Sequence, residues 1–364
     1  MITIGVDARS ALRKEPRGEG RSLIRLYEEV LRLRPDLRVW FFGDSAAADI
    51  FTQLPPGVKI DVSANWGHRI SGWENFSLPW KAIHRRCDVL HCASSTAPVW
   101  SPVPVVLTVH DLIPALQVDG HDAQARESFL RGLKRGARQA RRVIAVSDHT
   151  RQDLLSLFPE LEQKSTVIHW GCDTVVPDNE PALIHGKYFV TFGGSAPRKN
   201  TEYTIERFAS IAPLNPGIRL VIIGIGSTLK RESLFMLAEK LGVRDAIDIP
   251  GFVDERTLNN IVENACALLY FSRYEGFGLP VLESIVRGVP VLTSDRSSLP
   301  EILAGVPGCM CLDRPAEIEA VLNEVARDSA LRQNWAVAQR AVLEKFRWET
   351  TASRTLNSLL SAIG

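Results

Sequence analysis

The chain has 364 residues, of which 45% are hydrophobic and 23% charged, and its formal net charge is +1. This balance is typical of a globular protein and excludes disordered, collagen-like and coiled-coil sequences. At about 150 residues per domain, the length predicts two domains. A net charge this close to zero gives no reason to expect a nucleic-acid partner.

The cysteine content indicates a reducing compartment. The six cysteines show neither the density nor the spacing of a disulfide framework, and most lie in apolar runs. The N-terminus has no basic segment followed by an apolar one, and the longest uncharged stretch, residues 89–110, contains several prolines. We therefore expect a cytoplasmic protein without a membrane-spanning helix.

Short β-rich runs alternate with amphipathic segments through the first half of the chain. The predicted strands are residues 1–6, 38–42, 58–62, 89–92, 105–109 and 143–146, and the predicted helices are 22–33 and 125–140. Strands separated by helical segments favour a parallel sheet with helices on its faces.

The alternation starts again after a polar segment at residues 173–186, which we interpret as a linker. The predicted strands are residues 188–192, 219–223, 247–249, 267–271 and 289–293, and the predicted helices are 201–211, 227–241, 257–265, 280–287, 316–325, 330–345 and 348–360. Two such units in tandem predict an α/β protein with two Rossmann-like domains facing a cleft, residues 1–174 and 175–346.

The most specific local pattern is at residues 274–283, Tyr-Glu-Gly-Phe-Gly-Leu-Pro-Val-Leu-Glu, which follows a predicted strand and opens a predicted helix. Its two glycines allow close backbone approach, and amides at a helix N-terminus attract anions. The pattern predicts a phosphate site lined by Gly276, Phe277, Gly278 and Leu279. The alternative is a glycine turn with solvated glutamates.

Two carboxylates flank this predicted phosphate site. Glu283 lies about one turn into the helix, and helical side chains lean toward the N-terminus, so it can reach hydroxyl groups of the ligand. Glu275 precedes the helix and is expected on the opposite side of the ligand. One carboxylate for a ribose and one for a sugar is a coherent arrangement.

The spacing of Glu275 and Glu283 resembles the paired-glutamate signature of retaining glycosyltransferases of family 4, which have the GT-B fold. Further segments resemble landmarks of that family in the family's order: residues 108–114, 143–148, 193–200, 288–291 and 297–301. The resemblance implies a C-terminal domain that binds a nucleotide sugar and an N-terminal domain that binds the acceptor. It also implies that a C-terminal helix, residues 347–364, packs back on the N-terminal domain.

The resemblance also implies roles for the two glutamates and for two cations. Glu275 would position hydroxyls of the donor sugar, and Glu283 would hold the ribose. Arg198 and Lys199 can neutralise a diphosphate, and by resemblance they form the diphosphate clamp of the leaving group. The alternative is a solvated basic turn. Many relatives have an arginine where this chain has Gly194.

Three further positions enter through the family resemblance. His110 follows a predicted strand, and its side chain or main chain would lie against the donor sugar; the alternative is a structurally satisfied histidine. Gly18 and Gly20 resemble the family's glycine-rich first loop, which closes over the donor phosphate; a plain turn is the alternative. The backbone at Val253 would border the nucleotide base.

No cofactor is expected beyond the nucleotide-sugar substrate. The sequence has no Asp-x-Asp pair of the kind that commonly holds a divalent ion in other glycosyltransferases, so we expect no metal site. By resemblance, the enzyme is a metal-independent, retaining hexosyltransferase that acts by front-face displacement, with the leaving diphosphate taking the acceptor proton.

Two basic segments indicate a further partner. Residues 126–142 carry seven basic residues and one acid along an apolar stripe, Phe129, Leu130, Leu133, Ala137 and Ala140. A second cluster combines aromatic and basic residues: Trp73, Phe76, Trp80, Lys81, Arg85 and Arg86. The first segment is a solvated face, binds an acidic acceptor or rests on an anionic membrane surface. A membrane contact through these segments would place the protein peripherally on the inner face of the cytoplasmic membrane.

The sequence as a whole resembles bacterial mannosyl- and related hexosyltransferases of surface-polysaccharide pathways, including lipopolysaccharide synthesis. The first hypothesis is therefore transfer of mannose from GDP-mannose to a glycan or a polyprenyl-diphosphate-linked saccharide. A UDP-sugar donor is the second. A nucleotide-sugar epimerase of the same fold, a Rossmann oxidoreductase and a non-catalytic carbohydrate-binding relative are the alternatives from other classes.

Overall fold

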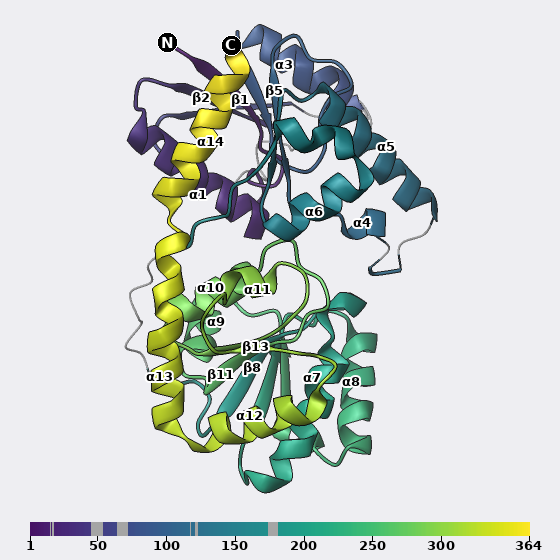
Figure 1. The fold of residues 1–364 in the computed structure, drawn as a ribbon, viewed down its shortest axis with the longest axis vertical. Helices are drawn as coiled ribbons and strands as arrows, with labels where there is room; N and C mark the ends of the chain where they lie inside the picture. The colour runs from purple at the N-terminus through teal and green to yellow at the C-terminus, as the bar shows by residue number, and fades with distance from the viewer. Residues whose placement is uncertain are drawn as a thin grey trace. The chain divides into compact units, whose positions relative to one another are not determined.

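The computed structural model describes residues 1–14, 16, 18–44, 54–63, 72–116, 118–120, 123–173 and 181–364 (Figure 1). The predicted domain boundary at residues 174 and 175 and residues 174–180 of the predicted linker lie outside the described residues. The chain divides into two compact units. Unit 1 comprises Met1–Gly171 and Phe346–Gly364, and unit 2 comprises Cys172–Lys345.

Unit 1 is built on a seven-stranded sheet in which every strand pairing is parallel, with the order β3-β2-β1-β4-β5-β6-β7. The strands are β1 (Thr3–Asp7), β2 (Arg38–Gly43), β3 (Val58–Val62), β4 (Val89–Cys92), β5 (Val105–Val109), β6 (Arg142–Ala145) and β7 (Ser165–Val167). Parallel strands covered on both faces read as nearly continuous apolar runs. This is why β1, β4 and β5 were recognisable from the sequence.

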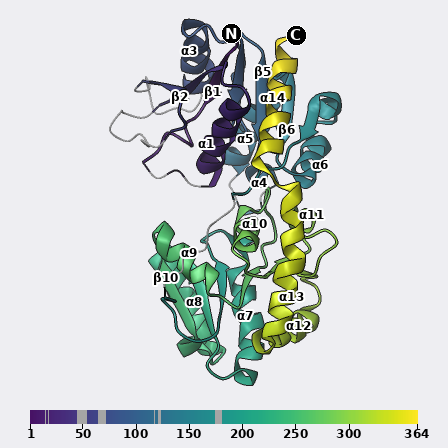
Figure 2. The same ribbon diagram turned by 90° about the vertical axis from the view of Figure 1, so that its left-hand side faces the viewer.

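Helices cover both faces of this sheet (Figures 1 and 2). They are α1 (Gly18–Leu33), a π-helical turn η2 (Trp73–Ser77), α3 (Leu78–His84), α4 (Ile113–Leu116), α5 (Ala123–Gln139), α6 (Asp148–Leu157), a 3₁₀ segment η3 (Pro159–Lys164) and α14 (Trp348–Ile363). Residues of α3, α5 and α6 share one buried cluster with the sheet, including Leu78, Leu133 and Leu154. The C-terminal helix α14 lies against α1 and also contacts β4, β5 and β6.

The start of α1 corrects the sequence prediction. The helix was expected at residue 22, after a glycine-rich loop, but it begins at Gly18, so Gly18 and Gly20 lie in its first turn. A Cβ atom at Gly20 would collide with the carbonyl oxygen of Ser10. The close approach of two backbone segments, rather than a flexible loop, therefore accounts for the glycine at position 20.

Unit 2 contains a six-stranded sheet, again with only parallel pairings, in the order β10-β9-β8-β11-β12-β13. Its strands are β8 (Tyr188–Phe192), β9 (Arg219–Ile223), β10 (Ile247–Gly251), β11 (Ala267–Tyr270), β12 (Val291–Ser294) and β13 (Cys309–Met310). Its α-helices are α7 (Thr201–Ile211), α8 (Thr228–Lys240), α9 (Glu255–Glu263), α10 (Leu279–Val286), α11 (Leu299–Ile302), α12 (Pro315–Arg327) and α13 (Ser329–Arg340). Its 3₁₀ segments are η4 (Pro197–Lys199), η5 (Ala212–Leu214), η6 (Arg244–Ala246) and η7 (Ala341–Lys345).

The prediction of an α/β fold with two parallel sheets is confirmed. In each sheet the strand order reverses once, beside β1 in unit 1 and beside β8 in unit 2. Ligands of such sheets bind outside the carboxyl ends of the strands, next to this reversal. The loops after β1, β4 and β5, and those after β8, β11 and β12, therefore lie where each unit is expected to bind its ligand.

A buried histidine stabilises the centre of unit 1. His91 on β4 is fully buried, with Nδ1 2.8 Å from the Tyr27 hydroxyl and Nε2 2.8 Å from the Thr108 hydroxyl. Burial, together with the neighbouring His110, lowers the pKa of His91 to about 3. The imidazole is therefore neutral in the folded protein, whereas an unfolded chain protonates it below a pH of about 6.5.

This difference predicts a pH-dependent stability. As the pH falls from about 6.5 toward 4, the unfolded state takes up a proton that folded His91 does not bind. The free energy of unfolding should therefore decrease by up to about 1.4 kcal/mol per pH unit through this one group. In His91→Gln, which is destabilised at pH 7, this dependence should be weaker by that amount in urea unfolding curves. His84→Gln on the exposed side of α3 is the control, and an equal slope in His91→Gln and the parent would contradict the assignment.

Candidate functional site

The loop that carries Glu275 ends in a helix N-terminus. Gly278 has a φ of 116°, a conformation that residues with a side chain rarely adopt. A Cβ atom there would also lie 2.9 Å from side-chain atoms of Leu299 and Ile302. Helix α10 starts immediately afterwards at Leu279 with Pro280 in its first turn. Residues 276–279 thus form a tight turn at the N-terminus of α10, where backbone amides and the helix dipole favour an anion.

A cation and a carboxylate meet beside this turn. Lys199 Nζ lies 2.8 Å from Glu275 Oε1 and donates to the Tyr270 hydroxyl at 2.9 Å, and that hydroxyl donates to the same Glu275 oxygen at 2.9 Å. The Lys199 and Glu275 side chains are only 18% and 11% exposed, and Tyr270 is fully buried. We call this closed arrangement the Lys199–Tyr270–Glu275 ring.

Burial and charge act against each other in this ring. Burial alone would lower the pKa of Lys199, but the contacts with Tyr270 and Glu275 outweigh it and raise the pKa above its ordinary value. Burial raises the pKa of Tyr270, and the Glu275 carboxylate raises it further. Lys199 is therefore a permanent cation at neutral pH, and Tyr270 keeps the proton that it donates.

Two serines hold the backbone of the Glu275 loop. The Glu275 amide donates to Ser297 Oγ at 2.8 Å, and the Ser298 hydroxyl reaches the carbonyl oxygens of Glu275, at 3.0 Å, and Phe277, at 2.8 Å. Ser297 has a φ of 52°, which is unusual for a residue with a side chain and indicates that the surrounding contacts fix this turn. The loop after β12 therefore shapes the loop after β11.

The turn that carries Arg198 and Lys199 is anchored to the same region. Asn200 adopts the left-handed conformation, with a φ of 55°, and its side-chain amide donates to Phe271 O at 3.0 Å. The Arg273 amide donates to Arg198 O at 2.7 Å. These contacts place the Arg198–Lys199 turn against the segment that leads to Glu275. A Cβ atom at Gly194 would lie 3.1 Å from Lys199 Cγ, so glycine leaves room for the lysine side chain.

The other predicted residues of unit 2 lie outside the ring. Glu283 is exposed on α10, and its backbone carbonyl accepts from the Arg287 guanidinium at 2.6 Å. Val253 follows β10, an edge strand that β9 separates from β8. The structure therefore brings together Lys199 and Glu275 and places the Arg198 backbone against the segment that leads to Glu275.

In unit 1, His110 is held from several directions after β5. Its Nε2 atom lies 2.5 Å from the carbonyl oxygen of Ala93, and its amide donates to Ser95 Oγ at 3.0 Å. The ring stacks on Trp170, with 5.7 Å between centroids and 17° between planes. The His110 carbonyl accepts from the Thr150 hydroxyl at 3.3 Å. These contacts fix the orientation of the imidazole ring.

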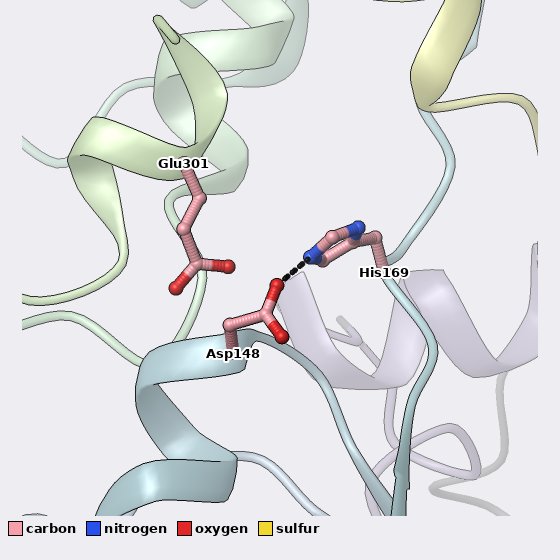
Figure 3. Close-up of side chains that lie close together, drawn as sticks. All are labelled: Asp148, His169 and Glu301. Atoms are coloured by element: carbon pink, nitrogen blue, oxygen red, sulfur yellow. Dashed lines mark ion pairs between the residues drawn. The ribbon is translucent and has the colours of Figure 1, made fainter.

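A second histidine in unit 1 pairs with an acid. His169 Nε2 lies 3.9 Å from Asp148 Oδ2 at the N-terminus of α6, as Figure 3 shows. The His169 ring also packs edge-on against Phe346, with 5.5 Å between ring centroids. Within unit 1 this pair supplies only two potential metal ligands, fewer than the three or four protein ligands that zinc sites use.

Sequence reasoning missed several residues that position the site. The sequence places Tyr270 only within a predicted strand, residues 267–271. The hydrogen-bond partners of its hydroxyl could not be predicted, because they depend on the order of the strands in the sheet. Ser297 and Ser298 belong to a segment that resembles a family landmark, but no local pattern indicates that they bind the backbone of the Glu275 loop. One sequence signal was available at position 200. Asparagine tolerates the left-handed backbone conformation better than most residues, and Asn200 adopts it.

Comparison with known proteins places the chain in a family. Residues 16–176 match Glycosyltransferase Family 4, and residues 179–342 match Glycosyl transferases group 1. The chain therefore belongs to the group 1, family 4 glycosyltransferases, which have the GT-B fold.

Two curated relatives and one solved structure illustrate the similarity. The chain is 26% identical over 268 residues to O-antigen chain mannosyltransferase B of Escherichia coli, covering 70% of this chain and 69% of that protein. It is 26% identical over 266 residues to the E. coli serotype-specific mannosyltransferase WbdA, covering 69% of this chain but only 32% of WbdA. The crystal structure of Anabaena HepE in complex with UDP and glucose matches with a TM-score of 0.75 and 18% identity, covering 99% of this chain and 100% of HepE.

The ring predicts a specific pattern of stabilities. Tyr270→Phe removes one hydroxyl and should lower the free energy of unfolding by about 1 kcal/mol, because the Lys199–Glu275 ion pair remains. Lys199→Met should cost about 3 kcal/mol, because it leaves a largely buried carboxylate without its cation. Adding Glu275→Gln to Lys199→Met should recover part of that loss. Urea unfolding measures all three, and additive losses in the double variant would contradict the proposed coupling.

Proposed function

We propose that the chain transfers a hexose, with retention of configuration, from a nucleotide sugar to a saccharide acceptor. Membership of a retaining glycosyltransferase family supports this reaction class. The observation that carries the proposal is the Lys199–Tyr270–Glu275 ring beside the N-terminus of α10. It combines a fixed cation, helix amides and a carboxylate within one unit, as the diphosphate and sugar of such a donor require.

In this proposal unit 2 binds the donor. The amides of residues 276–279 and the cations Arg198 and Lys199 hold the diphosphate. Glu275 accepts hydrogen bonds from sugar hydroxyls, and Glu283 accepts them from the ribose. Gly194 and the backbone at Val253 line the remainder of the nucleotide site. Because Lys199 already pairs with Glu275, the cation is preorganised and need not move far to meet phosphate oxygens.

The reaction itself requires no protein nucleophile. The acceptor hydroxyl oxygen forms a bond to the anomeric carbon on the face from which the diphosphate leaves, and the carbon–oxygen bond to the diphosphate breaks. The acceptor proton passes to a phosphate oxygen of the leaving group. Negative charge develops on the diphosphate during this step, so Lys199, Arg198 and the helix amides stabilise the transition state more than the ground state. They supply the charge that a metal ion supplies elsewhere, and we propose that the enzyme is metal-independent.

Unit 1 is proposed to bind the acceptor and to contribute His110 to the donor sugar. Gly18 and Gly20, in the first turn of α1, are proposed to border the donor phosphate through the backbone. The acceptor is a glycan or a polyprenyl-diphosphate-linked saccharide of a bacterial surface polysaccharide, such as lipopolysaccharide.

GDP-mannose is the first choice of donor, because the two E. coli relatives named above are mannosyltransferases. A UDP-sugar is the alternative, supported by the UDP and glucose in the HepE structure. A nucleotide-sugar epimerase of the same fold would release isomerised sugar and free nucleotide without an acceptor. These three activities differ in their products and can be separated in one assay.

Exposed side chains of unit 1 support a peripheral membrane contact, although the apolar stripe of α5 does not. Leu133 and Ala137 are buried, and Phe129 and Leu130 pack against the same core, so this stripe is unavailable for insertion. In the second cluster Trp73 and Lys81 are also buried, and Lys81 pairs with Asp61 at 2.5 Å. No helix among the described residues is long and apolar enough to cross a membrane.

The exposed members of the two clusters lie on connected elements. Phe76 and Trp80 are 76% and 68% exposed, and Lys134 and Arg135 are exposed on α5. A Cβ atom at Gly136 of α5 would lie 2.8 Å from the Ala97 amide nitrogen, and the Val99 amide donates to Asn75 Oδ1 at 2.8 Å. The loop at 97–99 therefore links α5 to η2. We propose that this aromatic–basic surface rests on anionic lipid.

The donor proposal is tested by binding and product analysis. Glu283→Ala should weaken binding of the preferred donor at least several-fold, because it removes the proposed ribose acceptor, while Glu239→Ala on α8 should not. Thermal shifts with GDP-mannose, UDP-glucose and other sugar nucleotides measure this. Lys199→Ala should nearly abolish turnover. Unchanged donor affinity in Glu283→Ala would remove the ribose assignment, and isomerised sugar without transfer would establish the epimerase alternative.

The membrane proposal is tested with vesicles of phosphatidylcholine and phosphatidylglycerol. Two variants should each reduce the sedimented fraction several-fold: one changes Phe76 and Trp80 to serine, and the other changes Arg131, Lys134 and Arg135 to alanine. The effect of the second variant should be weaker at high salt. Leu229 and Met236, 79% and 64% exposed on α8 of unit 2, provide the control when both become serine. Equal sedimentation of all variants would contradict a membrane contact through this surface.

A further inference from the structure

Glu19 lies where it can act on His110. It occupies the first turn of α1, beside Gly20, whose close approach to the Ser10 carbonyl fixes the backbone. Its Oε1 atom accepts a hydrogen bond from the Ser94 hydroxyl at 2.7 Å and lies 3.7 Å from His110 Nε2. An acid in a glycine-rich turn thus reaches across the carboxyl end of the sheet to the turn after β4 and to His110.

The contacts of His110 determine which ring nitrogen carries the proton. A carbonyl oxygen can only accept, so the 2.5 Å contact with Ala93 O requires a hydrogen on Nε2. When the imidazole is neutral, Nδ1 is therefore the atom with a lone pair. Within the described part of unit 1, no residue forms a hydrogen bond with Nδ1. This nitrogen is available to a ligand, whereas Nε2 is committed to the protein.

The other groups described around the His110 imidazole do not place a negative charge beside Nε2. Trp170 offers an aromatic face, and His91 on β4 is neutral and fully buried between Tyr27 and Thr108. The Asp111 carboxylate, on the adjoining residue, accepts from the Ile113 amide at 3.0 Å. Glu19 is the acid whose carboxylate lies beside Nε2 among the described residues of unit 1.

We propose that Glu19 is a positioning residue for His110: its carboxylate, held by Ser94, favours the Nε2-protonated ring, so that the lone pair on Nδ1 is presented to a sugar hydroxyl. As with the acid of a hydrolase triad, the carboxylate touches no substrate, but here a backbone carbonyl accepts the ring N–H. The part that concerns a sugar hydroxyl rests on the proposed function. The coupling between Glu19 and His110 does not, because it involves only the protein.

The coupling can be measured without any enzymatic assay. Nitrogen-15 NMR of the histidine side chains reports the tautomer of each ring, and His110→Gln identifies the His110 signal. The full chain should show the Nε2-protonated form at neutral pH. In Glu19→Gln, which keeps the size of the side chain and a group for Ser94, the fraction of the Nδ1-protonated tautomer of His110 should rise several-fold, because the charge that favours a hydrogen on Nε2 is lost.

Glu28→Gln is the matched control, because Glu28 is an exposed acid on the same helix that pairs with Arg25. Its effect on the His110 tautomer should be much smaller. A tautomer ratio in Glu19→Gln that equals that of Glu28→Gln, or an Nδ1-protonated ring in the parent chain, would overturn the proposal. A variant that fails to fold would be recognised by its far-ultraviolet circular dichroism, and Glu19→Asp would then replace it, with a smaller change in the tautomer ratio expected.

Kinetics separate this inference from the proposed function. If the chain is a transferase, Glu19→Gln should lower kcat while the donor KM changes little. A purely structural role would instead lower the melting temperature and leave the His110 tautomer unchanged. A change of the His110 ring in Glu19→Gln without any transferase activity would support the coupling to Glu19 and contradict the proposed function. Transferase activity without that change would support the proposed function and contradict the coupling.

Discussion

The pairing of Lys199 with Glu275 is the interaction on which the candidate site depends. Each charge is largely removed from water, and either one alone would carry a large desolvation cost. Together with the Tyr270 hydroxyl they satisfy one another in a closed ring. The pair is possible only because the turn at 198–200 and the loop at 271–278 are fastened together by Asn200 and by backbone contacts. A ligand that carries negative charge therefore meets a lysine that is already in place and already charged.

Sheet topology explains why these loops meet. In a parallel sheet every strand ends at the same edge, and the reversal of order beside β8 separates the crossovers that would otherwise cover that edge. The loops after β8, β11 and β12 supply Lys199, Glu275 and the two serines, respectively. Unit 1 repeats this arrangement with different side chains, because the turn after β4 and the residue after β5 bring Ser94, Ser95 and His110 together.

The two units hold their principal side chains in different ways. In unit 2 the charges of Lys199 and Glu275 neutralise each other, so an anion bound there, as proposed, would share Lys199 with Glu275. In unit 1 the imidazole is fixed by a backbone carbonyl, an aromatic face and a neighbouring acid, so one of its nitrogens remains available. The first arrangement suits the binding of a diphosphate, and the second suits a hydrogen bond to an uncharged hydroxyl. A nucleotide sugar presents both kinds of group.

The sequence by itself determined the features that depend on neighbouring residues. Apolar runs in regular alternation with amphipathic segments gave the two α/β units, and the glycines and proline around residue 278 gave the start of α10. The short strands β7 and β13 escaped notice because two or three residues carry too little periodicity. The first turn of α1 was mistaken for a loop because Gly20 is required by the close approach of the Ser10 carbonyl and not by a flexible turn. Tertiary structure alone decided which charges meet: Lys199 and Glu275 are 76 residues apart, and so are not neighbours in any local pattern. Such contacts depend on strand order and loop anchoring, which no local pattern encodes.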